Sequence, residues 1–238
     1  KAGEEIELKQ EKIHGGMRYY LRPFDVAHGG HPALGYTIVS KTSIRKLKPE
    51  YKGMDGKELG KLVRNSVEIN DVSMIEKVEV CYTGDTNIDG LLLHGNGEDV
   101  DLSDSTRFKK QGFTAPLILC EVTYILESDR QLAKDRGHMN LFDLEPVLNS
   151  HNWKLRDDEQ DCEEVKTDNQ IIFYHLSSRG RTAENILESM ANALPKDLLE
   201  VSEVALASFP SSTSSHLLKT NGCISVADYI ETTNQAST

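Results

Sequence analysis

Three residues that could bind a metal ion each follow an apolar, strand-like run of the sequence: His28, Asp85 and His175. In α/β proteins, ligand-binding residues gather on loops beyond the ends of strands. Imidazole nitrogens and carboxylate oxygens suit Zn²⁺ or Mn²⁺ better than an ion that prefers thiolates. The pattern therefore predicts a metal site. Asp85 has two oxygens and could bridge two ions, which would polarise a hydroxide for attack on phosphorus.

Each of these residues also has an ordinary interpretation. A Gly-Asp-Thr turn such as residues 84–86 is often an Asx-turn that only shapes the backbone. A single histidine at a strand end is more often a hydrogen-bonded structural residue than a ligand. The prediction of a metal site therefore depends on all three residues occurring at strand ends.

A second pair of residues could move protons. Glu121 interrupts the apolar run at residues 115–126, and His138 follows Gly137 between two predicted helices. A buried carboxylate is costly unless it is paired or functional. Facing His138, it would orient the imidazole, and the imidazolium could protonate a leaving oxygen. The alternative is that Glu121 faces solvent on an edge strand and His138 caps a helix, and the spacing alone does not decide between the two.

Two segments have the composition of phosphate-binding sites. Ser177 and Arg179 lie where a helix is expected to begin, which suits a phosphate, although an ordinary N-cap is the alternative. Residues 41–64 hold eight Lys or Arg and three acids in a chain of net charge −11. We interpret this segment as a basic protruding hairpin whose Lys46, Lys48 and Lys52 could contact a nucleic-acid backbone. A solvated charged loop is the alternative.

Composition limits the class of protein. The net charge of −11 excludes a globally basic nucleic-acid binder. The apolar run at 115–126 is too short to span a bilayer. The four cysteines show no Cys-x-x-Cys spacing, and two of them, Cys81 and Cys120, lie in apolar, strand-like runs. This pattern predicts that these two are buried thiols and indicates a reducing compartment, with an organelle such as a mitochondrion or plastid compatible.

The order of predicted elements indicates an α/β layer structure. Strands are expected at residues 6–8, 17–21, 24–27, 35–40, 77–83, 116–126, 171–174 and 201–207, and helices at 128–136, 141–149 and 182–194. Residues 87–113 and 152–170 are polar and look like insertions. Residues 209–238 are rich in Ser and Thr and are expected to form a C-terminal tail of low core content.

An ordered set of motifs resembles tRNase Z, the metallo-β-lactamase-fold endonuclease that trims tRNA 3′ trailers. The likeness is greatest to the short, plant-type form and covers about residues 20–208. Any one motif is weak, and the ordered set is specific. The motifs are HGGHPALGY at 28–36, KPEYKG at 48–53, VEIND at 67–71, YTGDT at 82–86, CEVTY at 120–124, RGH at 136–138 and HLSSR at 175–179.

The resemblance implies a role for each matched position. It implies two zinc ions and phosphodiester hydrolysis by a metal-bound hydroxide on a tRNA precursor. Residues 41–70 match, in shortened form, the arm that clasps the tRNA elbow. The implied metal ligands are His28 (with His31 as the alternative), Asp85 and His175, and the implied proton-transfer pair is Glu121 and His138.

The sequence also departs from the family pattern. The signature His-x-His-x-Asp-His loop, which supplies most zinc ligands, does not occur in it, and Gly180 stands where the family has an aromatic residue. The residues present supply at most three ligands, whereas each zinc needs four or five. We therefore expect residues 1–208 to form the C-terminal half of a metallo-β-lactamase αββα sandwich, completed by a partner chain or a missing N-terminal half.

Three functions fit this interpretation. The first is the C-terminal part of a tRNA 3′-processing endonuclease, active only with the complementary half. The second is a non-catalytic, tRNase Z-derived subunit of a large assembly, such as an organellar ribosome or a respiratory complex. The third is a tRNA-binding module that keeps only the arm. Metal content separates the first from the second, and arm substitutions test the third.

Overall fold

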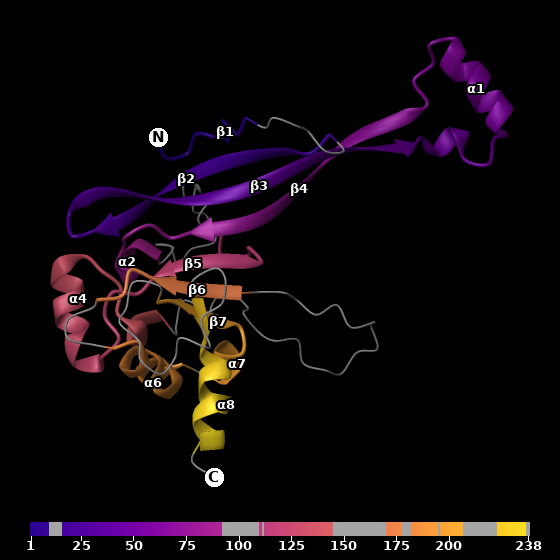
Figure 1. Cartoon of the computed structure of the whole chain (residues 1–238). Coiled ribbons are helices and arrows are strands. Elements are labelled where there is room, and N and C mark those ends of the chain that lie inside the picture. The colour runs from indigo at the N-terminus through magenta and orange to yellow at the C-terminus, as the bar shows by residue number, and fades with distance from the viewer. Residues whose placement is uncertain are drawn as a thin grey trace.

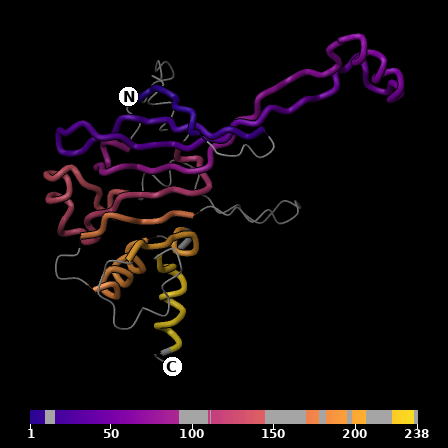
Figure 2. Tube along the Cα trace, turned by 45° about the horizontal axis from the view of Figure 1, so that its top comes forward, coloured from indigo at the N-terminus to yellow at the C-terminus, as the bar shows by residue number. Residues whose placement is uncertain are grey.

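In the described part of the chain, one mixed sheet of eight strands organises the fold, and the spatial order of the strands follows the sequence (Figures 1 and 2). The computed structural model describes residues 1–9, 16–91, 110, 112–144, 170–177, 182–194, 196–206 and 223–236. Strands β1 to β4 are antiparallel, β4 to β7 are parallel, and β8 is antiparallel to β7. The strands are β1 Ile6–Glu7, β2 Arg18–His28, β3 His31–Leu47, β4 Asn70–Tyr82, β5 Leu117–Glu121, β6 Gln170–Tyr174, β7 Ser202–Ala205 and β8 Cys223–Ser225.

Helices lie between the parallel strands, so the predicted α/β class is confirmed. The helix expected at 182–194 is also confirmed, and the Thr182 side chain caps it by accepting from the Asn185 backbone N–H in a capping box. The helices are α1 Gly56–Arg64, α2 Ile88–Leu91, α4 Arg130–Arg136, α6 Ala183–Ala193, α7 Lys196–Leu199 and α8 Val226–Ala236, with 3₁₀ turns η1 Pro49–Tyr51 and η2 Glu127–Asp129. No helix in the described part of the chain is long and apolar enough to cross a membrane.

The central strands bury one face and leave the other half-buried. In β5 and β6 the buried residues alternate with half-buried ones. Ile118 and Phe173 belong to the main hydrophobic core together with Ile186 and Met190 of α6. The half-buried face carries Leu119, Ile172 and other apolar side chains of the same strands. One face of the sheet is therefore covered by helices, and the opposite face remains partly open.

Two predicted boundaries differ from the structure. The strands expected at 17–21 and 24–27 are one strand, β2, which pairs with β3 without interruption. Pro23 is tolerated because β1 pairs only with Tyr20 and Leu21, so Pro23 lies on an edge where a missing N–H costs little. Part of the expected tail, Cys223–Ser225, instead pairs with β7 and continues into α8. Residues 207–222 lie outside the described residues.

Strands β3 and β4 continue beyond the body of the sheet as a two-stranded hairpin that ends in η1 and α1 (Figures 1 and 2). The basic residues at 41–64 are carried by this hairpin and its tip. The sequence indicated an arm over the same segment, 41–70. Most of the two expected insertions, at 92–109, 111 and 152–169, lies outside the described residues.

The described cysteines Cys81, Cys120 and Cys223 are all buried. Burial raises the pKa of the Cys81 thiol to about 12, so this thiol is not a nucleophile near neutral pH. Cys162 lies outside the described residues.

Candidate metal centre

The direction of the strands brings the sequence-predicted residues to one edge of the sheet. Strand β2 is antiparallel to β3, and β3 is antiparallel to β4, so β2 runs in the same direction as the parallel strands β4, β5 and β6. The carboxyl ends of all four strands therefore meet at the same edge, where α/β proteins bind ligands. His28 ends β2, Asp85 follows β4, Glu121 ends β5 and His175 follows β6.

Three imidazole rings gather at this edge. The ring centroids of His28 and His138 are 4.7 Å apart, and those of His138 and His175 are 5.1 Å apart. The ring centroid of His31 is 6.4 Å from that of His28, and the His31 side chain is exposed. The structure therefore places His28, rather than His31, inside the cluster.

All three imidazoles use Nδ1 for a hydrogen bond within the protein. His28 Nδ1 is 3.1 Å from the carbonyl oxygen of Gly137, and His138 Nδ1 is 2.8 Å from Glu121 Oε1. His175 Nδ1 is 2.8 Å from Thr123 Oγ1. Histidines that bind metal through one ring nitrogen characteristically have the other nitrogen engaged in this way. The arrangement leaves each Nε2 as the nitrogen that could serve the site.

The distances fit a metal ion between two of these donors. His175 Nε2 lies 3.8 Å from Asp85 Oδ2. Zinc bonds of about 2.0–2.2 Å allow two donors on one ion to lie at most about 4.3 Å apart. Donor atoms of Glu121, His138 and His175 lie within 4.8 Å of one another, so they form a second group near this limit. Hydrogen bonds already occupy both oxygens of Glu121, however, so this carboxyl group is better suited to orienting its neighbours.

Glu121 is fully buried and hydrogen-bonded on both oxygens. Oε2 accepts from the backbone N–H groups of Thr86, at 2.8 Å, and Met139, at 3.2 Å. Oε1 accepts from Thr123 Oγ1 at 2.5 Å and lies beside His138 Nδ1. Burial raises the pKa of Glu121 to about 7, although these hydrogen bonds and the charge of His175 act in the opposite direction.

Burial also lowers the pKa of His138, and the nearby His28 lowers it further. The pKa values of Glu121 and His138 therefore approach each other, because the carboxyl group becomes a weaker acid and the imidazole a weaker base. Such a pair can exchange a proton close to neutral pH, which is the property of a general acid or base. The second interpretation of the sequence, in which Glu121 faces solvent on an edge strand, is wrong because β5 lies between β4 and β6.

Two glycines allow the loops of this edge to approach one another. Gly84 has φ +68°, and a Cβ there would lie 2.3 Å from the carbonyl oxygen of Leu34. Gly137 has φ +75°, and a Cβ there would lie 1.9 Å from the backbone nitrogen of Gly29. Only glycine fits both the backbone conformation and the close contact. The contact at Gly137 brings the β2–β3 turn onto the end of α4, which places His28 beside His138.

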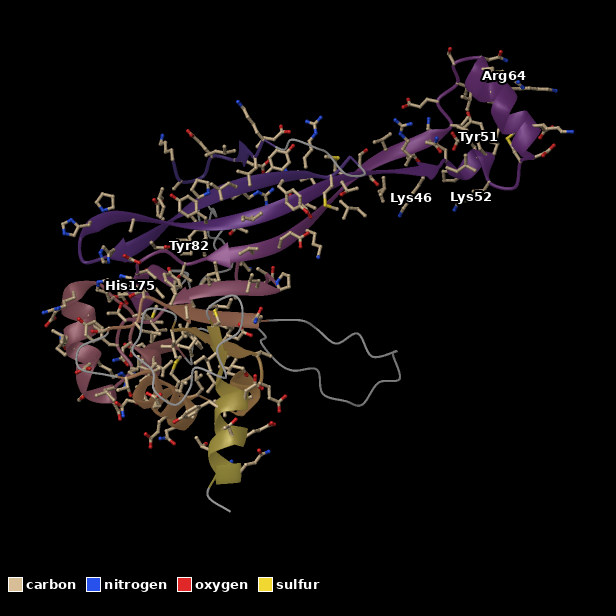
Figure 3. The ribbon with its side chains drawn as sticks, in the orientation of Figure 1. Lys46, Tyr51, Lys52, Arg64, Tyr82 and His175 are labelled. Carbon is tan, nitrogen blue, oxygen red and sulfur yellow. The ribbon has the colours of Figure 1, made fainter. Side chains whose placement is uncertain are left out.

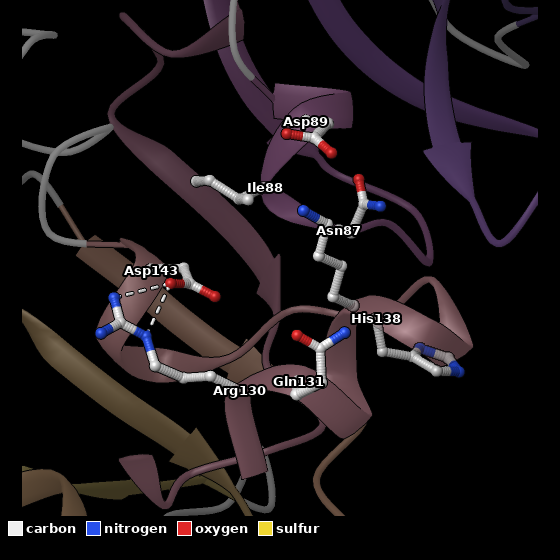
Figure 4. Close-up of a pocket in the computed structure, with 8 residues that line it drawn as sticks. Asn87, Ile88, Asp89, Arg130, Gln131, His138 and Asp143 are labelled. Atoms are coloured by element: carbon white, nitrogen blue, oxygen red, sulfur yellow. Dashed lines mark hydrogen bonds and ion pairs between the residues drawn. The ribbon is translucent and has the colours of Figure 1, made fainter. Parts of the chain in front are cut away.

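A pocket of about 310 Å³ opens on the same edge. It is lined by Thr123, Tyr124, Arg136, His138, His175, Leu176 and Ser177. Ser177, expected from the sequence to bind phosphate, therefore lies at the site, whereas Arg179 is outside the described residues. A second pocket of about 200 Å³ shares His138 as a wall, as Figure 4 shows, and is lined by Asn87, Ile88, Asp89, Arg130, Gln131, Lys134 and Asp143.

The arm lysines do not join this cluster. Figure 3 shows Lys46 and Lys52 on the hairpin, far from His175 at the body of the molecule. Lys46 and Lys52 are exposed, and Lys48 is half-buried where β3 leads into η1. The predicted substrate-binding residues therefore form two separate groups, one at the strand edge and one on the arm.

Comparisons with known proteins point to one family. No family model matches the chain. Over 183 residues, or 76% of this chain, the sequence is 29% identical to tRNase Z TRZ2, chloroplastic, of Arabidopsis thaliana. Over 165 residues, or 69% of this chain, it is 28% identical to tRNase Z TRZ1 of the same plant. The chain is a distant relative of tRNase Z.

The relationship to tRNase Z implies the metallo-β-lactamase fold, and the mixed eight-stranded sheet with its helices agrees with it. The chain spans less than half of each relative, 40% of the first and 47% of the second. The donors at the strand edge also agree with the general metal dependence of tRNase Z.

One residue of the site was missed by the sequence argument. Thr123 lies in the CEVTY motif, yet no role was expected for it. Its hydroxyl contacts Glu121, His138 and His175. The available signal was its place two residues after Glu121, which puts both side chains at the same strand end.

Proposed function

We propose that this chain is the C-terminal part of a zinc-dependent tRNA 3′-processing endonuclease whose metal centre is completed by a segment outside it. The observation that carries the proposal is the cluster of three histidines and Asp85 at one strand edge, with every Nδ1 engaged and every Nε2 left for the site. The distant relationship to tRNase Z supports it.

The number of donors supports the need for a completing segment. His28, Asp85 and His175 are the ligands we propose, and a zinc ion takes four donors in most protein sites. A dinuclear centre therefore needs donors beyond these three. We propose that they come from a segment that lies elsewhere on the same polypeptide or on a second chain.

The partly open face of the sheet supports the same conclusion. Tyr36, Tyr82 and Tyr174 stack in sequence across it, with ring centroids 6.3 and 5.2 Å apart. All three are half-buried, as are the apolar residues Leu119 and Ile172 of the same face. An apolar face of this kind favours cover by another layer of structure.

The chain's own residues would handle protons and the substrate phosphate. When bound, the zinc ions would supply Lewis-acid activation of water and neutralise charge on the phosphate. His138, oriented by Glu121 at 2.8 Å, would hold the proton that a leaving oxygen requires. Ser177 would contact the phosphate in the pocket that it lines with His138 and His175.

The arm would hold the RNA at a distance from the cleavage site. Residues 41–64 carry eight Lys or Arg against three acids, although the whole chain is acidic. Such a segment binds phosphates without reading sequence. We propose a tRNA precursor as the substrate, with its body on the arm and its 3′ end at the strand edge.

Cleavage by the reconstituted complex tests this function. The chain is combined with the completing segment, and tRNA precursors with 3′ trailers are added with zinc. We expect a cut at the trailer junction that Asp85→Ala lowers at least a hundredfold, because a metal ligand is lost. Cleavage that is indifferent to Asp85→Ala would refute the proposal.

The partly open sheet face also fits a second candidate function, a non-catalytic subunit of a larger assembly, since any partner could cover that face. Metal content separates the two. Zinc bound by His28, Asp85 and His175 in the native assembly excludes a purely structural role. A native assembly without zinc at this edge favours it.

A further inference from the structure

The hydroxyl of Thr123 lies between the proposed proton pair and the proposed metal ligand His175. Thr123 Oγ1 is 2.5 Å from Glu121 Oε1, 2.8 Å from His175 Nδ1 and 3.3 Å from His138 Nδ1. A hydroxyl has one proton to donate, and its two lone pairs can accept. Its neighbours therefore decide which way each hydrogen bond runs.

In this set of hydrogen bonds, the carboxyl group of Glu121 is the acceptor, and backbone contacts hold its orientation. Its Oε2 accepts from the backbone N–H groups of Thr86 and Met139, which can only donate. This orients Oε1 toward Thr123 and His138. Short O–H···O bonds of about 2.5–2.7 Å are typical of a hydroxyl that donates to a carboxylate. The single proton of Thr123 is therefore directed at Glu121 Oε1.

This direction leaves one option for His175. Because the Thr123 proton points to Glu121, Oγ1 can only accept from His175, so His175 Nδ1 must carry a proton. Its Nε2 then carries the lone pair, and this atom lies 3.8 Å from Asp85 Oδ2. His28 reaches the same state through a backbone acceptor, the carbonyl oxygen of Gly137.

Thr123 also holds the segment that carries His175. The carbonyl oxygen of Thr123 accepts from the Ser177 backbone N–H at 3.0 Å. His175 has φ +64°, a strained conformation for a residue other than glycine, which persists only where the surroundings enforce it. Thr123 therefore binds this segment through both its side chain and its backbone.

We propose that Thr123 is a positioning residue that holds His175 in the Nδ1–H tautomer and turns the Nε2 lone pair toward Asp85. The identity of Nε2 as the metal-binding atom rests on the proposed function. The tautomer itself follows from the hydrogen bonds and can be measured without metal.

Long-range ¹H–¹⁵N correlation spectra of the zinc-free, histidine-labelled chain at pH 8 test the proposal. Histidine side chains are ordinarily neutral at this pH, so the two ring nitrogens report the tautomer. The signals of His175 are identified by their loss in His175→Gln. We expect Nδ1–H to dominate in the wild type. Thr123→Val should shift the ratio toward Nε2–H about fivefold, the effect of one typical hydrogen bond.

Two further variants make the result specific. Thr123→Ser keeps the hydroxyl and should restore the wild-type ratio. Thr37→Val replaces another buried threonine, which is hydrogen-bonded to Cys81, and should leave His175 unchanged. A structural effect of losing a buried hydroxyl would instead appear in both valine variants.

A dominant Nε2–H tautomer in the wild type would overturn the proposal, as would an unchanged ratio in folded Thr123→Val. If Thr123→Val does not fold, the wild-type and Thr123→Ser spectra decide. The experiment needs neither RNA nor zinc. An inactive reconstituted complex with His175 as the Nδ1–H tautomer would therefore count against the proposed function and leave the role of Thr123 standing.

Discussion

Glu121 is a carboxyl group without exposed surface, and the fold rather than solvent sets its protonation. Four hydrogen-bonding partners surround its two oxygens: two backbone N–H groups, one hydroxyl and one imidazole. Burial nevertheless dominates and raises its pKa to about 7. This makes Glu121 the residue whose pH dependence is easiest to separate from that of ordinary surface carboxylates.

Glu121→Gln should remove a pH-dependent loss of stability. An unfolded Glu has a pKa of about 4.3, so between pH 4.3 and 7 the folded state binds more protons than the unfolded state. The contribution of Glu121 to the free energy of unfolding is therefore highest below this window and falls as pH rises through it, by at most about 4 kcal/mol. Denaturant unfolding at pH 5 and pH 8 measures the difference.

Gln keeps the shape of the side chain, and its oxygen can accept from the Thr86 and Met139 backbone N–H groups. His138 contributes a pH dependence of the opposite sign, because its lowered pKa makes the free energy of unfolding larger at higher pH. The comparison is therefore made between wild type and variant at each pH. Equal pH dependence of the two proteins would show that Glu121 does not titrate with a raised pKa.

The sequence left the Glu121–His138 pairing open for a physical reason. Whether Glu121 faces solvent or the interior depends on the strands on either side of β5, and one of them, β6, comes about fifty residues later. Apolar periodicity does not contain this non-local information. The grouping of His28, Asp85 and His175 at one edge was easier to predict, because the carboxyl ends of parallel strands share an edge.

At the scale of elements, the contact between the β2–β3 turn and the end of α4 positions His28. Gly137→Ala should lower the free energy of unfolding by about 1–3 kcal/mol, because it adds left-handed strain and a clash with Gly29. It should also separate the imidazoles of His28 and His138, which proton–proton contacts in NMR spectra would report.

Gly53→Ala is the matched control for this contact. Gly53 has φ +88°, and a Cβ there would meet nothing within 4 Å. This variant therefore carries the backbone strain without the clash. If both variants lose the same stability and Gly137→Ala keeps the His28–His138 contacts, the close approach does not position His28.

Arg22 of β2 is linked by ion pairs to β4 and to the segment before β1. Its side chain is 3% exposed and pairs with Glu5 of the segment before β1, at 2.7 Å, and with Glu76 of β4, at 2.5 Å. Arg22→Met should lower the free energy of unfolding by about 2 kcal/mol at pH 7, because two carboxylates lose a charged hydrogen-bond donor. Arg18→Met removes the exposed pair with Glu7 and should cost about 0–1 kcal/mol.

The same network predicts acid sensitivity. Burial alone would raise the pKa of Glu5, but the hydrogen bonds from Lys41 and Arg22 and their charges lower it overall. The unfolded state therefore binds more protons than the folded state below about pH 4.3, and this stabilisation is lost as pH falls through the lowered pKa. In Arg22→Met, the free energy of unfolding should therefore fall less steeply as the pH is lowered through this range. The same steepness in wild type and variant would contradict this role.

Element prediction succeeded for local patterns and failed for pairings over long distances in the sequence. The Thr182 cap and the α6 helix follow from adjacent residues. Strand β8 does not, because three residues in a Ser/Thr-rich stretch become a strand only through pairing with β7. Ile224 is buried by that pairing, although its surroundings in the sequence suggest an exposed tail.

At the scale of the whole molecule, the arm and the strand edge are two separate sites, and the paired strands β3 and β4 extend from the body of the sheet to the arm (Figure 3). Lys46→Glu with Lys48→Glu should weaken tRNA binding by the complex and lower its salt dependence by about one unit of slope per lost phosphate contact. Filter binding at several salt concentrations measures both.

Lys77→Glu is the control, because Lys77 is an exposed lysine of β4 outside the basic segment. It should change affinity and salt slope much less than the arm variant. Equal effects of the two variants would indicate a general response to charge and would remove the special role of the arm.

The central claim is that the common carboxyl edge of β2, β4 and β6 supplies ligands to a metal centre. The zinc stoichiometry of the purified complex with the completing segment tests it most directly. We predict that His28→Ala and Asp85→Asn each lose bound zinc, whereas His31→Ala, three residues from His28, retains it. Full zinc occupancy in both His28→Ala and Asp85→Asn would contradict the account.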